Sequence, residues 1–511
     1  MQSQSRVIGR MNIGPHVAAV PRPALLCVTN AEGFSSALMA SLIVTVAAVG
    51  FLSFSNRFDH WFLIPISICG VLIGTDAIEW VRGRLGLYDP VGILGIVGFH
   101  FFFLAPLLHV KWDFWMGYVS PPPDWRDWLG YLGILNAVGL ICYRICSRAF
   151  SNRAFASPCR VFWQIDRKTF STFAPFCLVV AVVTQLWVYA RLGGISGYMQ
   201  ARIDDPGVFR GMGWIFMISE SAPILLAFLI VVRVQQRMIS WPCIVMSLVA
   251  LFVMGMVFGG LRGSRSETVE LLFWVVGCIH FLVRPIPRKL IYCGAVFLML
   301  FMYFYAFYKN AGPEATAAFS GSAERHQLAQ RTGRTFEGLV LGDLSRADLQ
   351  AFILYRLVND DRDFSYAKGR TYLGALSLFI PRWILAERPE SKLKEGTEIQ
   401  AGSGEYVPNL LWSSKVYGLA GESMLNFGPL SVPFVYAFFG FLVGWFRAGV
   451  ARLLPGDARF LLAPFGAYMC VSALAADSDN LTFGLAKNGL LPFLVVIVCS
   501  SKLRHFVRCS R

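Results

Sequence analysis

Hydrophobic residues in this chain fall into long uninterrupted segments, not into the short alternating runs of a soluble domain. About a dozen segments follow one another and are broken once, by a polar stretch from Lys309 to Phe427. A helix needs roughly 20 mostly apolar residues to cross a hydrocarbon layer about 30 Å thick. The expected spans lie near residues 35–54, 61–80, 91–110, 128–146, 173–190, 214–232, 240–259, 267–283, 290–308, 428–446, 460–476 and 486–501.

The composition supports this interpretation. Of the 511 residues, 56% are hydrophobic and only 15% are charged, which is more apolar surface than a water-soluble core can bury. The pattern predicts an all-α polytopic integral membrane protein with about 12 transmembrane helices and one long, partly helical outer loop. Its parts are an N-terminal tail (1–34), helices one to nine (35–308), the outer loop (309–427), three further helices (428–501) and a C-terminal tail (502–511).

The basic residues predict the orientation. Outside the long loop, most Lys and Arg fall in loops that share one side of the membrane with both termini, which makes that side cytoplasmic. All 12 cysteines lie in expected spans or on this inner side, as expected if the outer compartment is oxidising. The net charge of +15 then reflects inner loops that rest on anionic lipid headgroups, and no nucleic-acid partner is expected.

The long outer loop carries ordered elements. Apolar residues recur at helical spacing from Leu344 to Val358, and Ser345 with Asp348 forms a capping-box pattern at the start. This helix is expected to lie on the bilayer surface or to pack on the bundle. The apolar stretch from Tyr372 to Leu385 is too short to span and is broken by Pro381, so it predicts a re-entrant or interfacial element.

Arginines cluster at the outer ends of the spans and are the first candidate site residues. Arg262 and Arg265 lie in a glycine-rich turn, where two guanidinium groups can bind an anion such as pyrophosphate at membrane depth. Alternatively, they extend to the interface or pair with Glu267 and Glu270. The other candidates at this face are Arg191, Arg202, Arg210, Arg370 and Arg382.

Carboxylates are fewer. Glu220 lies inside the sixth span, where a charge requires a partner, and it either neutralises an arginine or transfers a proton. Glu405 and Glu422 lie just before the loop returns to the membrane. The two D-x-D pairs are too short a pattern to indicate a metal, so neither a metal nor another cofactor is expected; they are Asp361 with Asp363 and Asp477 with Asp479.

Several short motifs together resemble the bacterial Wzy-type O-antigen or oligosaccharide repeat unit polymerases. The resemblance covers roughly residues 85–445, and its most specific part is Gly421-Glu422 followed by Asn426-Phe427-Gly428. The chain departs from the pattern at Arg388, where Lys is expected, and at Ser431, near which a further Gly is expected. The remaining motifs are Gly369-Arg370-Thr371-Tyr372, Ile380-Pro381-Arg382, Arg388-Pro389, Gly263-Ser264-Arg265 and Asp89-Pro90.

The resemblance implies block transfer of sugars on the outer face of the bacterial inner membrane. A hydroxyl of one lipid-linked repeat unit attacks the anomeric carbon of a chain held on undecaprenyl pyrophosphate. Arg265 and Arg382 would stabilise the leaving pyrophosphate, and either Glu422 or Glu220 would accept the proton. Expected partners are these lipid-linked oligosaccharides, membrane lipids and a chain-length regulator protein. The residues expected to bind substrate are Arg191, Arg202, Arg210, Arg262, Arg370, Tyr372, Glu405 and Asn426.

Two rival functions stay open at this point. An O-antigen ligase has a similar architecture and donor and differs in its acceptor. A lipid-linked oligosaccharide flippase or other transporter also has about twelve helices, but it is expected to place charges at mid-membrane on facing helices. The sequence does not identify the sugars, the linkage or the final polysaccharide.

Overall fold

The chain is described here from a computed structural model, and its described residues are mostly helical. The structure describes residues 31–53, 58–115, 119–152, 161–204, 206–209, 211–235, 239–311, 315, 321–332, 335–359, 364–380, 384–385, 388–389, 392–407 and 415–504.

Ten helices among these residues are long and apolar enough to cross a membrane, which confirms a polytopic helical membrane protein. Several of them are composite, because a turn of π- or 3₁₀-helix interrupts the α-helix. They are α1 (Ala31–Leu52), α2 (Leu63–Val81), α3 (Pro90–Phe99) with η2 (His100–Leu104) and α4 (Ala105–Trp112), α5 (Trp125–Asn152), α6 (Arg167–Arg191), α8 (Gly213–Ser219) with α9 (Ala222–Val234), α10 (Trp241–Phe258) with η5 (Gly260–Arg262), α12 (Arg288–Ala311), η8 (Pro429–Ser431) with α18 (Val432–Ala451), and α20 (Ser478–Gly484) with η10 (Leu485–Gly489) and α21 (Leu490–Val498).

Two of the twelve expected spans are helices at the expected positions but are not among these ten, and a third has different bounds. The eighth is α11 (Arg265–Leu282), an 18-residue helix with charged residues in its first turns. The eleventh is α19 (Ala463–Ala475), which has only 13 residues. The twelfth was expected near 486–501 but runs from Ser478 to Val498, because its first turns are polar and carry no strong hydropathy signal.

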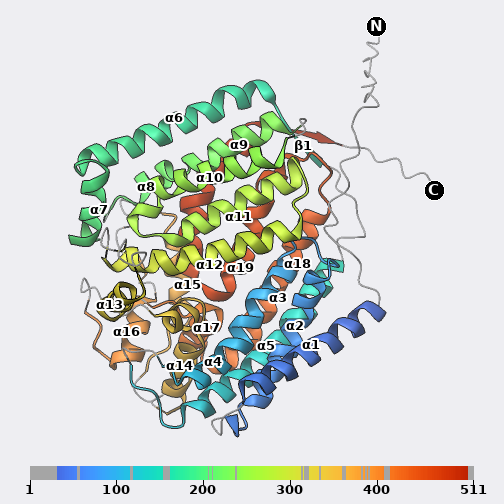
Figure 1. Cartoon of the computed structure of the whole chain (residues 1–511), viewed down its shortest axis with the longest axis vertical. Coiled ribbons are helices and arrows are strands. Elements are labelled where there is room, and N and C mark those ends of the chain that lie inside the picture. The colour runs from blue at the N-terminus through green and yellow to red at the C-terminus, as the bar shows by residue number, and fades with distance from the viewer. Residues whose placement is uncertain are drawn as a thin grey trace, which may run out of the picture.

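The described parts of the long loop gather at one end of the bundle, called here the loop end (Figure 1). The predicted amphipathic helix is α14 (Ala347–Asn359). At its start, the hydroxyl of Ser345 accepts a hydrogen bond from the Ala347 N–H. The helix packs on α5 in the hydrophobic core. It therefore belongs to the bundle and does not lie on the bilayer surface. The elements at this end are α7 (Gly194–Asp204), η4 (Pro206–Phe209), α13 (Ser322–Thr332), η7 (Gly338–Asp343), α14 (Ala347–Asn359), α15 (Arg370–Ser377), α16 (Leu393–Ala401) and α17 (Gly418–Phe427).

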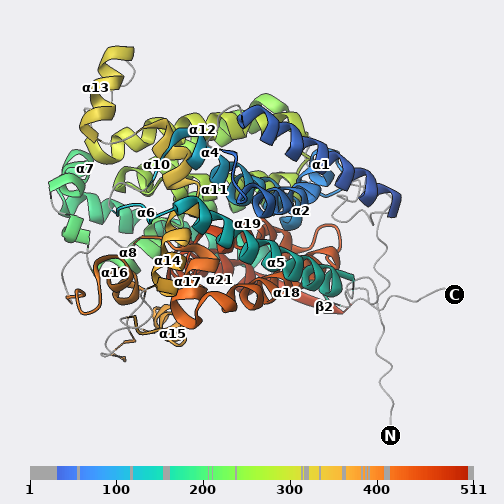
Figure 2. The ribbon, with the colours of Figure 1, turned by 90° about the horizontal axis from the view of Figure 1, so that it is seen from below.

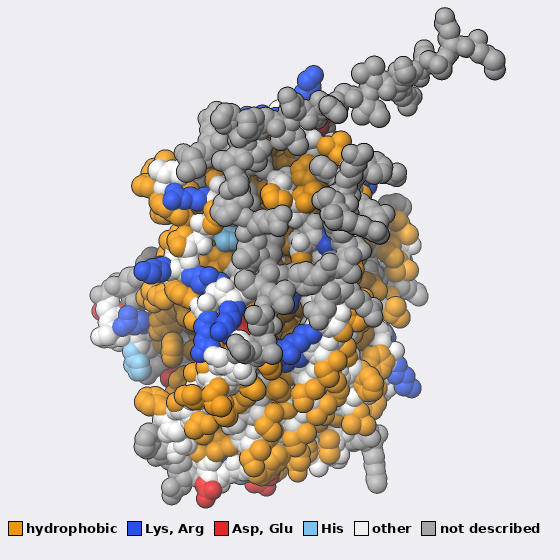
Figure 3. Space-filling model, turned by 90° about the vertical axis from the view of Figure 1, so that its right-hand side faces the viewer, with side chains coloured by type: hydrophobic (Ala, Val, Ile, Leu, Met, Phe, Trp, Pro, Cys, Tyr) orange, Lys and Arg blue, Asp and Glu red, His pale blue; other side chains and the backbone are white. Residues whose placement is uncertain are grey.

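A two-stranded antiparallel ribbon lies at the opposite end, called here the strand end (Figure 2). Strand β1 (Val161–Ile165) pairs with β2 (Ser500–Arg504) and so connects the last membrane helix to the start of α6. The short helix η9 (Ala458–Leu461) packs beside β1. Lys and Arg side chains gather across the middle of this face in Figure 3. This is the distribution that the basic loops of the sequence predict.

Two hydrophobic cores hold the helices together. One joins α2, α4, α5, α14, α17 and α18, and the other joins α6, α9, α10, α11, α19 and α21. Two glycines of α18 allow it to cross α5 closely: a Cβ at Gly440 would collide with the Tyr143 carbonyl, and one at Gly444 would lie 2.6 Å from the Ser147 carbonyl. Small residues four apart promote such close helix contacts in membranes.

Buried ion pairs neutralise the charges near the strand end. Asp76, a charged residue within the apolar helix α2, lies 2.6 Å from the guanidinium of Arg144 on α5. Asp89 lies 2.8 Å from Arg447 on α18 and also accepts a hydrogen bond from the Val91 N–H at the start of α3. These pairs connect helices far apart in the sequence and explain how charged residues are tolerated there.

Candidate functional site

The glycine-rich turn between α10 and α11 brings charged side chains close to the backbone. Gly263 adopts a positive φ of 98°, which favours glycine. A Cβ at Gly259 would collide with the Glu267 carboxylate, so a larger residue there would displace this side chain. Two tyrosines of α12 hold the turn: Tyr305 donates a hydrogen bond to the Gly260 carbonyl, and Tyr308 donates one of 3.0 Å to the Leu261 carbonyl.

Glu220 lies at a break in a membrane helix. Helix α8 ends at Ser219 and α9 begins at Ala222, and Pro223 at the start of α9 cannot donate the backbone hydrogen bond that a continuous helix requires. The side chain of Glu220 is only 3% exposed. The prediction that this buried charge has a partner is confirmed, because it contacts two cations.

Four charged residues from four elements form what we call the turn cluster: Glu220, Arg262, Glu267 and Lys487. The Arg262 guanidinium lies 2.9 Å from Glu220 Oε1 and 3.3 Å from Glu267 Oε1, and it stacks 4.2 Å from the centre of the Phe216 ring. The Lys487 ammonium group, from η10, forms ion pairs with both Glu220 and Glu267. Each carboxylate of the cluster therefore contacts both cations.

Lys487 is the main residue of this site that the sequence analysis missed. The expected span 486–501 put it at a helix end, whereas the observed helix from Ser478 to Val498 puts it near the middle. It is the only charged residue between residues 480 and 501, and a lone cation inside an apolar span is a signal of function. It also lies in a π-helical turn, a feature frequent at functional sites.

Arg265 connects the turn to the long loop. Its Nη2 lies 2.6 Å from Asp343 Oδ2 in η7, so a loop residue reaches the first turn of α11. Its Nη1 and the Nε of Arg262 are buried donors without a hydrogen-bond acceptor in the part of the chain that the structure describes. Buried N–H groups are rarely left unpaired. These two arginines thus retain donors that suit an anionic ligand.

A second group, called here the loop cluster, surrounds Glu422 on α17. Its carboxylate accepts hydrogen bonds from the Thr371 hydroxyl (2.8 Å), the Ser478 hydroxyl (2.5 Å) and the Ser478 N–H (2.6 Å). Asn426, one turn later, donates to the Thr371 hydroxyl at 2.7 Å and accepts from the Gly369 N–H at 2.9 Å. Glu422 and Asn426 thus join α15, α17 and the start of α20.

Charged residues beside the loop cluster are paired. Lys392 is 2% exposed and forms ion pairs with Asp477 and Asp479, so one D-x-D pair of the sequence faces an ammonium group. Arg370 forms an ion pair with Glu395 of α16. Arg370 and Arg265 thus have different partners among the described residues, and no contact between these two candidates is found there.

Of the remaining predicted site residues, Tyr372 lies beside the loop cluster, close to Glu422 and Asp477. Two others are exposed, and the rest lie outside the described residues. Tyr372 stacks on Phe427, with ring centres 6.3 Å apart, and burial raises its pKa. Arg191 is exposed and lies 5.5 Å from the Trp187 ring, and Glu405 is exposed in the turn after α16. The side chain of Arg202, on α7, and all of Arg210, Arg382, Asp361 and Asp363 lie outside the described residues.

The last membrane helix connects the two clusters. Ser478 at its start contacts Glu422, and Lys487, nine residues later, contacts Glu220 and Glu267. At a rise of 1.5 Å per residue this separation is about 13 Å. The two clusters are therefore held at a fixed separation by one helix.

Glu422 is expected to make stability depend on pH. Its burial and the nearby Asp477 carboxylate raise its pKa from 4.5 to about 7. The folded protein then binds more protons than the unfolded chain between these values, so stability should fall as the pH rises from about 4.5 to about 7. Thermal unfolding of the detergent-solubilised protein should show this slope, and Glu422→Gln should flatten it. Parallel curves of stability against pH for wild type and Glu422→Gln would contradict the prediction. The control is Glu324→Gln, at an exposed position, which should keep the wild-type slope.

Compared with protein-family models, curated proteins and solved structures, the chain has no match.

Proposed function

We propose that this protein is a glycosyltransferase of the outer face of the bacterial cytoplasmic membrane. It joins oligosaccharide repeat units carried on undecaprenyl pyrophosphate into a longer polysaccharide. The observation that supports this best is the pair of turn arginines, Arg262 and Arg265, each with a buried N–H donor for which no described residue supplies an acceptor. The motif resemblance of the sequence points to the same reaction.

The proposed reaction is a displacement at an anomeric carbon. The acceptor hydroxyl oxygen forms a bond to this carbon, and the bond from the carbon to the pyrophosphate oxygen breaks. The electron pair leaves with the pyrophosphate, and fixed guanidinium groups stabilise the charge that develops there. The hydroxyl proton passes to a carboxylate.

Glu220 is the better candidate for this base. All three hydrogen bonds to Glu422 come from donors that fix α15 and α20, which suits a residue that holds the loop on the bundle. Glu220 Oε1, by contrast, makes no hydrogen bond within the described residues and lies 2.9 Å from the Arg262 guanidinium at the helix break. Its protonation would weaken this ion pair but would break none of the contacts that hold the loop on the bundle.

The test is polymerisation by the purified protein. Supplied with undecaprenyl-pyrophosphate-linked repeat units and no other acceptor, it should produce a ladder of longer lipid-linked chains and release undecaprenyl pyrophosphate. A ligase would produce no ladder under these conditions and would transfer chains only when lipid A core oligosaccharide is added. The absence of product in both assays would overturn the proposal.

A lipid-linked oligosaccharide flippase is the second candidate, and one observation favours it. Glu220, Glu267 and Lys487 are charged residues buried between membrane helices, two of them at helix interruptions, as in transporters. In vesicles, a flippase would move a fluorescent lipid-linked oligosaccharide between leaflets without changing its length. A polymerase would lengthen it.

The proposed orientation puts the loop end outside the cell. Ser403, after α16, and Ser501, on β2, are both exposed and lie at opposite ends of the bundle. In spheroplasts, a membrane-impermeant thiol reagent should label Ser403→Cys, and it should label Ser501→Cys only after the membrane is permeabilised. Labelling in the reverse order would contradict the orientation and the site of the reaction.

A further inference from the structure

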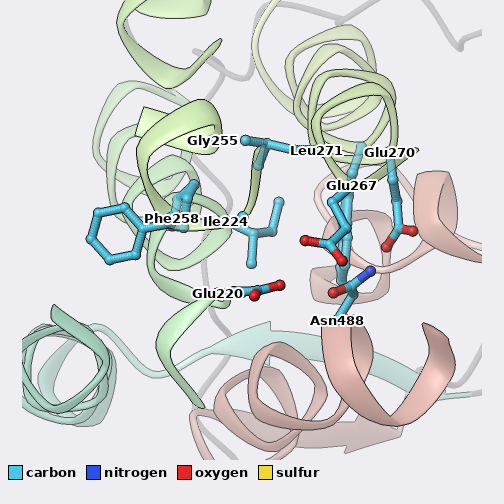
Figure 4. Close-up of a pocket in the computed structure, with 11 residues that line it drawn as sticks. Glu220, Ile224, Gly255, Phe258, Glu267, Glu270, Leu271 and Asn488 are labelled. Carbon is cyan, nitrogen blue, oxygen red and sulfur yellow. The ribbon is translucent and has the colours of Figure 1, made fainter. Parts of the chain in front are cut away.

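A cavity of about 40 Å³ adjoins the turn cluster. Its polar lining consists of three carboxyl groups and one amide, and Figure 4 shows Glu220, Glu267, Glu270 and Asn488 directed towards one another. Its apolar walls include Leu271 and Trp274. A space of this size has room for a water molecule, which needs polar partners such as these.

The charges around the cavity do not balance. Glu220, Glu267 and Glu270 would carry three negative charges if all were ionised, whereas the described residues in contact with them supply two positive charges, from Arg262 and Lys487. An unbalanced charge inside a membrane protein is costly and is usually removed by protonation. One of the three carboxyl groups therefore retains its proton.

Glu270 is the carboxyl group without a cation. Glu220 and Glu267 each contact both cations, but among the described residues no Lys or Arg lies within ion-pair distance of Glu270. It is buried and hydrogen-bonds with the amide of Asn488. The charged and titratable groups that face it are Glu267 on its own helix, Lys487 on η10, Tyr468 on α19, and, across the cavity, Glu220, whose carboxylate contacts Arg262.

We propose that this cavity is a proton-binding site in which Glu270 carries a proton at neutral pH and exchanges it with Glu220. In the exchange, the O–H bond of Glu270 breaks and an O–H bond of Glu220 forms, either directly or through a water molecule, while the negative charge moves the opposite way. The acceptor is the carboxylate of Glu220, whose side chain is 3% exposed and whose Oε1 lies 2.9 Å from the Arg262 guanidinium.

The exchange would respond to an anionic ligand. When an anion attracts Arg262 or Lys487, the Glu220 carboxylate loses part of its counter-charge and gains affinity for a proton. Such a site serves proton transfer in a glycosyl transfer reaction and in proton-coupled transport alike. It therefore does not depend on the proposed function, and its test needs no substrate.

The test is infrared spectroscopy of the purified full chain in detergent, in H₂O and in D₂O. Wild type should show a protonated-carboxyl C=O absorption that shifts in D₂O. Glu270→Gln should lose one such component while its thermal unfolding midpoint stays at the wild-type value, because glutamine matches a protonated glutamate in shape and charge. Glu220→Gln and the exposed control Glu324→Gln should retain the component.

The alternatives are distinguishable. An unchanged spectrum in Glu270→Gln, or loss of the component in Glu220→Gln, would overturn the assignment to Glu270. If Glu270→Gln does not fold, Glu270→Asp preserves the acid and should shift the frequency of the component. An identical frequency in wild type and Glu270→Asp would equally overturn the proposal.

Discussion

Replacing Lys487 with methionine is expected to lower the free energy of unfolding by about 3–5 kcal/mol, the usual cost of removing one partner from a buried ion pair. Lys487 is 2% exposed and pairs with Glu220 and Glu267, so its loss leaves two buried carboxylates with Arg262 as their only cation among the described residues. The measurement is unfolding of the purified protein in detergent, followed by a thiol-reactive dye that reports on the buried cysteines.

A charge-matched double variant separates lost charge from lost volume. Lys487→Met combined with Glu267→Gln removes one cation and one anion together, and it should recover part of the stability lost in Lys487→Met alone. Lys487→Arg retains the charge and should be milder than Lys487→Met. If Lys487→Met were as stable as wild type, Lys487 would not hold the turn cluster together.

Replacing Arg265 with alanine is expected to reduce polymerisation by tenfold or more, and Arg265→Lys should have a smaller effect. A charge-assisted hydrogen bond contributes roughly 1.5–3 kcal/mol, and each 1.4 kcal/mol is about tenfold in rate. Lysine retains the charge but loses the planar donor pair that binds two phosphate oxygens. The measurement is the rate of chain extension at equal protein abundance in the membrane.

Two controls accompany the Arg265 variants. Arg233→Ala removes an exposed arginine near the strand end of α9 and should leave the rate unchanged. Asp343→Asn removes the partner 2.6 Å from Arg265 and tests whether this contact alone determines the effect. If Arg265→Ala extends chains at the wild-type rate, Arg265 only anchors η7 to α11, and Arg262 becomes the better candidate for the anion site.

The membrane helices could be predicted from the sequence because hydropathy and length are local properties. Nine expected spans lie within a few residues of long apolar helices of the structure. The last membrane helix, Ser478 to Val498, was predicted less accurately from hydropathy. Polar residues at the start of α20 hide the first turns of the last helix from a hydropathy pattern, and Lys487 was therefore taken to lie at a helix end.

The sequence also identified chemically important residue types without identifying their partners. Arg262, Arg265 and Glu220 stood out because charges are costly in or near an apolar span. The pairing of Arg262 with the nearby Glu267 was one of the alternatives drawn from spacing. The pairing of Glu220 with Lys487, 267 positions further along the chain, and of Arg265 with Asp343 could not be read from spacing. Likewise, Glu422 was identified by a motif, whereas its contacts with Thr371 and Ser478 depend on how the loop folds.

The sequence by itself determined that the chain is a helical membrane protein with a charged, ordered loop at one end of the bundle, since each of these properties follows from short windows of residues. Only the tertiary structure decided that the charges form two separate clusters connected by the last helix. It also placed Glu270 beside a polar cavity, without a cation among the described residues. Ion pairs between helices depend on distances in space, and these follow from packing of the whole bundle.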